Sequence, residues 1–127
     1  MSNRKILIVD DDEGMLTQLK WGLEGYDVIT ASSRLHALEQ FDLHHPSLVS
    51  LDLGLPPDAE GTTQGFAILD DILKRAPETK VVIVSGAEEP GNAEKAKNNG
   101  AFGFLAKPIE LDQFQQIIQK AYSSTKN

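Results

Sequence analysis

The sequence predicts an α/β fold in which a parallel β-sheet lies between two layers of helices. Five short apolar or β-branched runs alternate with segments of helical periodicity. This alternation is typical of βα units, which build a parallel sheet covered by helices. A chain of 127 residues is long enough for one such sandwich and its hydrophobic core. We therefore expect a single domain over residues 1–127, with its core at about residues 5–122.

Five strands are predicted where short apolar runs are bounded by polar or turn-forming residues. The fourth is a continuous β-branched run, which is typical of a strand buried on both faces. In chain order the predicted strands are Lys5 to Val9, Asp27 to Ala31, about Ser47 to Leu51, Lys80 to Val84 and Ala101 to Leu105.

The first predicted helix follows directly after the first strand. Its apolar stripe consists of Met15, Leu16, Leu19 and Leu23. Asp12 directly precedes this stripe and is predicted to be the N-cap, and Gly25 is predicted to end the helix. Trp21 lies off the stripe, which favours a half-buried packing residue over a contact with a partner.

The other four helices are predicted from apolar stripes of unequal strength. The second is capped by Ser32 or Ser33 and the third ends before Pro77. The fourth, Pro90 to Asn99, offers only alanines for a core, so we expect low local stability there. The inward residues are Leu35, Leu38 and Phe41 in the second helix, Phe66, Leu69, Ile72 and Leu73 in the third, and Leu111, Phe114, Ile117, Ile118 and Ala121 in the last, Leu111 to Tyr122.

Composition excludes several classes of protein. The net charge of −7 and the absence of a basic stripe argue against direct contact with nucleic acid. No cysteine is present, so disulfides and cysteine zinc sites are excluded. No apolar stretch approaches the ~20 residues of a membrane span, and the polar start is no signal peptide. We therefore expect a cytoplasmic protein without membrane contact.

Reactive and charged residues stand where four of the predicted strands end. Asp10 and Asp11 follow the first strand, Asp52 the third, Ser85 the fourth and Lys107 the fifth. In an open parallel sheet these carboxyl ends face a common crevice in which ligands bind. Two carboxylates ~4 Å apart repel by about 4 kcal/mol at an effective dielectric constant of 20. Such a cluster either raises a carboxyl pKa or binds a cation.

Oxygen ligands with room for water suit Mg²⁺, and the neighbouring residues suit phosphoryl transfer. Asp52 could act as the nucleophile that forms an aspartyl phosphate. Lys107 and the metal would neutralise the transferring phosphoryl group, and Ser85 could donate a hydrogen bond to it.

The ordered set of DD after the first strand, D after the third, S after the fourth and KP after the fifth resembles the receiver domain of two-component response regulators. The resemblance covers about Lys5 to Tyr122. It implies that Asp52 is the phosphoacceptor. It also implies a Mg²⁺ site in which Asp11, Asp52 and the backbone carbonyl of Gly54 are direct ligands and Asp10 acts through bound water.

The same resemblance assigns roles to the residues around the acceptor. Ser85 matches the switch hydroxyl, Lys107 the phosphate-binding lysine and Phe104 the aromatic switch residue. The Lys107–Pro108 peptide bond is expected to be cis, as is common in the family. The implied fold is flavodoxin-like, a (βα)5 three-layer sandwich with strands in the order 2-1-3-4-5.

One segment departs from the family pattern. The third helix of the family usually begins with a glycine soon after the LP that follows the acceptor, and only Gly65 can take that place here. The loop Pro57 to Gln64 is therefore several residues longer than usual. The runs DLGLPPD, QGFAIL and TKVVIVSG resemble NtrC-like receivers fused to AAA+ activators of alternative-sigma-factor (sigma-54) promoters in the exosortase (PEP-CTERM) subgroup. Downstream AAA+ and DNA-binding domains would then belong to a longer parent protein.

The resemblance implies phosphorelay signalling rather than catalysis. A sensor histidine kinase or a small phosphodonor would phosphorylate Asp52 with Mg²⁺. The face of the fourth helix, fifth strand and fifth helix would then repack and control homodimerisation or an effector, with transcription regulation as the expected output.

Two alternatives stay open at this point, and the sequence argues against two others. One is a stand-alone regulator that acts by protein contact, and another is a degenerate receiver that serves only as an interaction module. A Mg²⁺-dependent phosphatase of the dehalogenase type would need DxDx[TV] after the first strand, which DDDEG does not fit. A nucleotide-binding module would need a glycine-rich first turn, which is absent.

Overall fold

Five parallel strands form the centre of the computed structural model, which describes residues 4–53, 63–86 and 91–124. Their order across the sheet is β2-β1-β3-β4-β5, as the resemblance implied. The strands are β1 (Lys5–Val9), β2 (Asp27–Ala31), β3 (Leu48–Asp52), β4 (Lys80–Ser85) and β5 (Gly103–Ala106). The central strands β1, β3 and β4 are almost entirely buried, because helices cover both of their faces.

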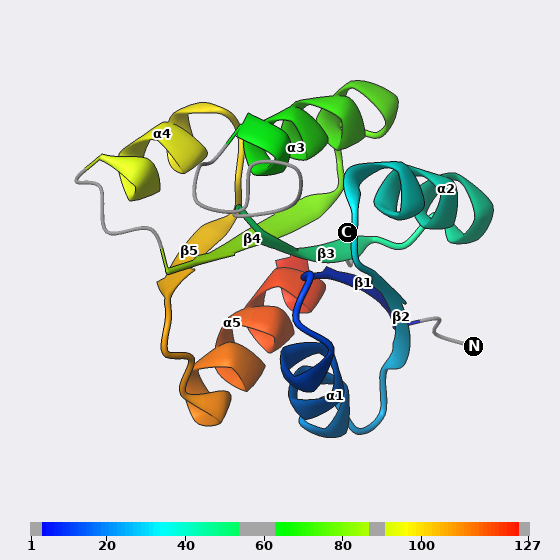
Figure 1. The fold of residues 1–127 in the computed structure, drawn as a ribbon, viewed down its shortest axis with the longest axis vertical. Helices are drawn as coiled ribbons and strands as arrows, with labels where there is room; N and C mark the ends of the chain where they lie inside the picture. The colour runs from blue at the N-terminus through cyan, green and yellow to red at the C-terminus, as the bar shows by residue number, and fades with distance from the viewer. Residues whose placement is uncertain (1–3, 54–62, 87–90, 125–127) are drawn as a thin grey trace.

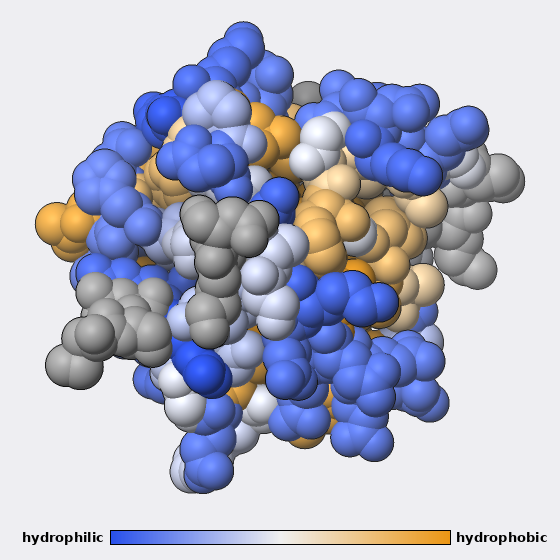
Figure 2. Space-filling view, turned by 180° about the vertical axis from the view of Figure 1, so that it is seen from behind, coloured by the Kyte–Doolittle hydropathy of each residue, from blue (hydrophilic) through white to orange (hydrophobic). Residues whose placement is uncertain are grey.

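Helices cover the sheet in two layers (Figure 1). On one face lie α2 (Arg34–His44), α3 (Thr63–Arg75) and α4 (Asn92–Asn98), and on the other lie α1 (Glu13–Trp21) and α5 (Leu111–Ser124). Each face has its own hydrophobic cluster, and alternate residues of the strands enter one or the other. Seen from behind, the surface is mostly hydrophilic, and its hydrophobic residues form separate patches (Figure 2).

The strand register brings the predicted reactive residues to one edge of the sheet. Val9 of β1 pairs with Leu51 of β3, and Ser85 of β4 pairs with Ala106 of β5. The residues that end these strands or directly follow them therefore lie at the same level. This level is the carboxyl edge, at which open parallel sheets bind their ligands.

The end of α1 differs from the prediction. The helix ends at Trp21, and Gly22 rather than Gly25 caps it. A side chain at Gly22 would collide with Leu111 of α5, so a glycine allows the two helices to approach closely. Gly25 lies in the following turn, where its positive φ of 93° explains the glycine.

Two side chains predicted to pack inside are exposed. Trp21 is 82% exposed, so the prediction of a half-buried residue was wrong. Leu35 is 70% exposed, because α2 buries Ala37 and Phe41 against the sheet and turns Leu35 outward. On α3, Ile68 joins Leu69 and Ile72 in the core.

Both predicted N-caps are present. Asp12 accepts hydrogen bonds from the backbone N–H groups of Gly14 and Met15, and Ser33 accepts one from His36.

The predicted loop Pro57 to Gln64 lies mostly outside the described residues, and its last two residues already belong to α3. Among the described helices, none is long and apolar enough to span a membrane.

Candidate functional site

Three aspartates from two neighbouring strand ends form an acidic cluster. Asp10 and Asp11 directly follow β1, and Asp52 is the last residue of β3. Each offers a carboxylate oxygen within 4.8 Å of the oxygens of the other two. Asp10 and Asp52 are 2% and 5% exposed, whereas Asp11 faces solvent. The cluster is therefore a buried acidic pocket with one side open to water.

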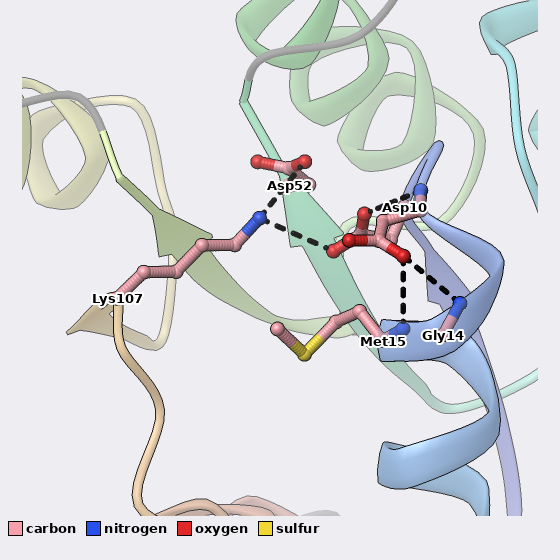
Figure 3. Close-up of polar contacts among 6 residues, drawn as sticks. Asp10, Gly14, Met15, Asp52 and Lys107 are labelled. Atoms are coloured by element: carbon pink, nitrogen blue, oxygen red, sulfur yellow. Dashed lines mark hydrogen bonds and ion pairs between the residues drawn. The ribbon is translucent and has the colours of Figure 1, made fainter.

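Lys107 places its ammonium between the two buried carboxylates (Figure 3). Its Nζ lies 3.2 Å from an oxygen of Asp52 and 3.4 Å from one of Asp10. Burial by itself lowers the pKa of Lys107, but the attraction and hydrogen bonds of Asp52 and Asp10 outweigh burial and raise this pKa above its ordinary value. The lysine therefore stays charged and offsets part of the repulsion among the carboxylates.

The turn after β1 holds the Asp10 carboxylate in place. One oxygen of Asp10 accepts a hydrogen bond of 2.9 Å from the backbone N–H of Asp12, and the other faces Lys107. The backbone N–H of Asp10 bonds to the carbonyl of Ala31, which continues the pairing of β1 with β2. Asp12 caps α1, so its carboxylate serves the helix end.

Ser85 and Lys107 are joined through the backbone at the ends of β4 and β5. The N–H of Lys107 donates to the carbonyl of Ser85 at 2.9 Å, and the Ser85 residue is 2% exposed. The Lys107–Pro108 peptide bond is cis. Phe104 lies on β5 opposite Ile83 and is partly buried against the cluster beneath α2, α3 and α4.

Two contacts beside the site were not assigned from the sequence. The side chain of Met15 extends from the first turn of α1 toward the pocket (Figure 3), although its spacing had placed it only in a core stripe. Gly65 of α3 packs so closely that a Cβ there would overlap the backbone of Leu53, the residue after Asp52. The family pattern predicted a glycine near the start of this helix, but it did not show that close packing is the reason. Gly54, the predicted carbonyl ligand, lies outside the described residues.

The chain matches one known protein family along most of its length. The family model described as the response regulator receiver domain matches residues 6–119. Among solved structures, a CheY-like receiver domain protein from Methanospirillum hungatei superimposes with a TM-score of 0.89 at 28% identity, covering 98% of both chains.

Relatives of two lengths match almost all of this chain. The chemotaxis protein CheY of Listeria monocytogenes is 31% identical over 120 residues, which cover 92% of this chain and 97% of CheY. The transcriptional regulatory protein GlrR of Escherichia coli is 33% identical over 118 residues, which cover 91% of this chain but 26% of GlrR. The chain thus spans about a quarter of GlrR and nearly all of CheY. It belongs to the receiver domain family of response regulators, whose members act in phosphorelay signalling.

Proposed function

We propose that this chain accepts a phosphoryl group on the Asp52 carboxylate. The observation that carries the proposal is the pairing of a nearly buried Asp52 with the Lys107 ammonium, 3.2 Å away, beside two further carboxylates. A carboxylate is an established nucleophile in aspartyl phosphate formation, and the Lys107 ammonium attracts its negative charge. The donor would be a phosphohistidine of a sensor histidine kinase or a small acyl phosphate.

The acidic cluster fits a divalent ion. Hard cations such as Mg²⁺ prefer oxygen ligands and usually keep several waters. Asp11 and Asp52 would bind it directly, and Asp10 would act through bound water, with the Gly54 carbonyl as a further ligand. When bound, Mg²⁺ would neutralise negative charge on the phosphoryl oxygens and on the carboxylates. The three aspartates bring their oxygens within 4.8 Å of one another and one of them faces solvent, which supports this assignment.

Each residue then has a separate part in the transfer. An oxygen of Asp52 forms the new bond to phosphorus, while the bond to the donor breaks and its electron pair leaves with the donor. Lys107 turns from the Asp52 carboxylate to the phosphoryl oxygens, and Ser85 donates a hydrogen bond to them. The protein acts mainly by holding these groups in position.

The output would begin at Ser85 and Phe104. The phosphoryl group carries a charge of about −1.5 to −2 in place of the single carboxylate charge, and its oxygens draw the Ser85 hydroxyl toward them. The space that Ser85 leaves would admit the Phe104 ring and bias the face of α4, β5 and α5 toward a second arrangement. This face would then control dimerisation or an effector.

Two kinds of output fit the relatives. The match to a quarter of the transcriptional regulatory protein GlrR favours transcription regulation through attached domains, which the resemblance gives as AAA+ and DNA-binding domains. The match to nearly the whole of CheY favours a stand-alone regulator that acts by protein contact. The chemistry at Asp52 is the same in both.

The test is phosphorylation by acetyl phosphate, followed by intact-mass spectrometry. We expect a mass gain of one phosphoryl group that requires Mg²⁺, is absent in Asp52→Asn and is unchanged in the exposed control Asp70→Asn. Beryllofluoride should bind with the same requirements. Absence of modification in the wild-type protein would refute the proposal, and multiple turnover of a phosphate ester would indicate an enzyme instead.

A further inference from the structure

The end of α1 carries an exposed tryptophan that the acidic site does not use. Trp21 is 82% exposed and is the only tryptophan of the chain. The other large hydrophobic side chains found exposed in the described residues are Leu35 and Leu43 of α2. Single exposed hydrophobic residues are common on protein surfaces, so exposure alone marks no interface.

Trp21 also lines a groove. The groove has a volume of about 650 Å³ and lies between the end of α1 and the start of β2. Its other apolar walls come from Leu23, Tyr26 and Val28. This volume lies within the ~300–1,000 Å³ of pockets that enclose small ligands, which are larger than one aromatic ring. The groove can therefore receive an inserted aromatic ring.

Charged residues of both signs border this groove. Lys20 lies on the α1 side, and Glu24 and Asp27 lie on the side of the turn and β2. All three are exposed, and within the described parts of the chain no ion pair joins any of them to another side chain. Their charges are available to a group that docks in the groove.

This charge pattern favours a second copy of the chain over a partner of one charge sign. In a two-fold contact every pair occurs twice. If a residue of the first copy contacts a second residue on the other copy, then that second residue on the first copy contacts the first residue on the other copy. Lys20 of each copy can then face Glu24 or Asp27 of the other. A uniformly basic or acidic partner would instead set like charges against each other at one side of the groove.

We propose that this groove is the interface of a symmetric homodimer in which each Trp21 indole enters the groove of the other copy. Asp27 begins β2, whereas Asp10, Asp52 and Lys107 lie at the carboxyl ends of their strands. The contact therefore leaves the acidic cluster open. It also lies apart from α4 and β5, since β2 and β5 are opposite edges of the sheet (Figure 1). The dimer forms without phosphorylation and does not rest on the proposed function.

Sedimentation velocity of the unphosphorylated protein over a wide concentration range tests this interface. We expect the average mass to rise from the monomer value of 13.9 kDa toward twice that value. The emission of Trp21 should shift to shorter wavelength over the same range, because the indole leaves water. Trp21→Ala should raise the dissociation constant at least ~10-fold, as expected when an aromatic anchor is removed.

Charge-reversal variants distinguish a dimer that uses this groove from a dimer that uses another surface. Lys20→Glu should weaken the dimer, and adding Glu24→Lys should restore it, because the opposite charges face each other again. Leu43→Ser is the matched control, since Leu43 is 71% exposed on the other face and should be neutral. Asp52→Asn should dimerise like wild type, so the two proposals can fail independently. A monomer at all concentrations, or a dimer indifferent to Trp21→Ala, would overturn the inference.

Discussion

Lys107 is the residue on which the metal-free acidic site depends most. Lys107→Gln removes the ammonium that lies between Asp10 and Asp52, so both buried carboxylates lose their ion pair with it. We expect the free energy of unfolding to fall by about 1–3 kcal/mol. Loss of a fully buried partner costs more, but the Lys107 side chain is 25% exposed. Urea denaturation in EDTA at neutral pH measures the change. Lys74→Gln, which breaks an exposed pair with Asp70, should have no measurable effect.

The pH dependence of this contribution follows from the raised pKa of Lys107. Because the folded protein holds the proton more tightly than the unfolded chain, the stabilisation is complete below the ordinary value of 10.5. It is lost as the pH rises through the folded-state value. The difference in stability between wild type and Lys107→Gln should therefore stay constant at neutral pH and shrink only in strongly alkaline solution. A difference that already disappears between pH 6 and 8 would contradict this assignment.

Gly65 has a steric role that can be tested with a second glycine, Gly86, as the control. Gly65→Ala would drive a methyl group into the backbone of Leu53, next to Asp52. Alanine normally stabilises a helix relative to glycine, so a net loss of about 1–3 kcal/mol would identify the overlap as its cause. Phosphorylation of Asp52 should slow as well. Gly86→Ala is the control, because the nearest atom to its methyl group would be Lys107 Cδ at 3.6 Å.

At the scale of elements, α4 is the shortest of the described helices. Of its seven residues only Asn92 and Ala96 are buried, and the buried Asn92 side-chain nitrogen has no hydrogen-bond partner among the described residues. A contact of the Lys95 ammonium with the Phe66 ring, at 4.5 Å, links α4 to α3. Amide hydrogen exchange should therefore be faster in α4 than in α5, which buries Phe114, Ile118 and Ala121. Equal protection of the two helices would show that α4 is not poised to move.

The elements that sequence reasoning located correctly are those with local causes. The bounds of β1 and β2 were predicted to the residue, because apolar runs and the following turns determine them. The close approach of Gly22 to Leu111, a residue far away in the chain, was not predicted. A stripe read from periodicity cannot reveal such a contact.

The sequence also predicted which residues gather at the candidate site, but not their detailed contacts. Parallel strands bring their carboxyl ends together, so the gathering of Asp10, Asp52 and Lys107 followed from the strand assignments. Which carboxylate oxygen faces the ammonium depends on the turn after β1, where the N–H of Asp12 holds one oxygen of Asp10. The packing of Gly65 on Leu53 likewise depends on how α3 docks on the sheet.

At the scale of the whole molecule, a metal that binds only the folded state stabilises every element together. Asp10, Asp11 and Asp52 meet only after β1 and β3 have paired, so the unfolded chain lacks the site. Mg²⁺ at 100 times its dissociation constant should add about 2.7 kcal/mol to the free energy of unfolding. Thermal unfolding with and without Mg²⁺ measures this increment as an upward shift of the midpoint.

Asp11→Asn should abolish most of the Mg²⁺ increment while leaving the stability in EDTA nearly unchanged, because Asp11 is exposed. Glu39→Gln, another exposed acidic residue, should keep the full increment. An equal increment in all three proteins would mean that Mg²⁺ acts through general screening of the net charge of −7 rather than through a specific site. Sodium chloride at matched ionic strength provides the decisive comparison, since screening would be reproduced by it and coordination by the aspartates would not.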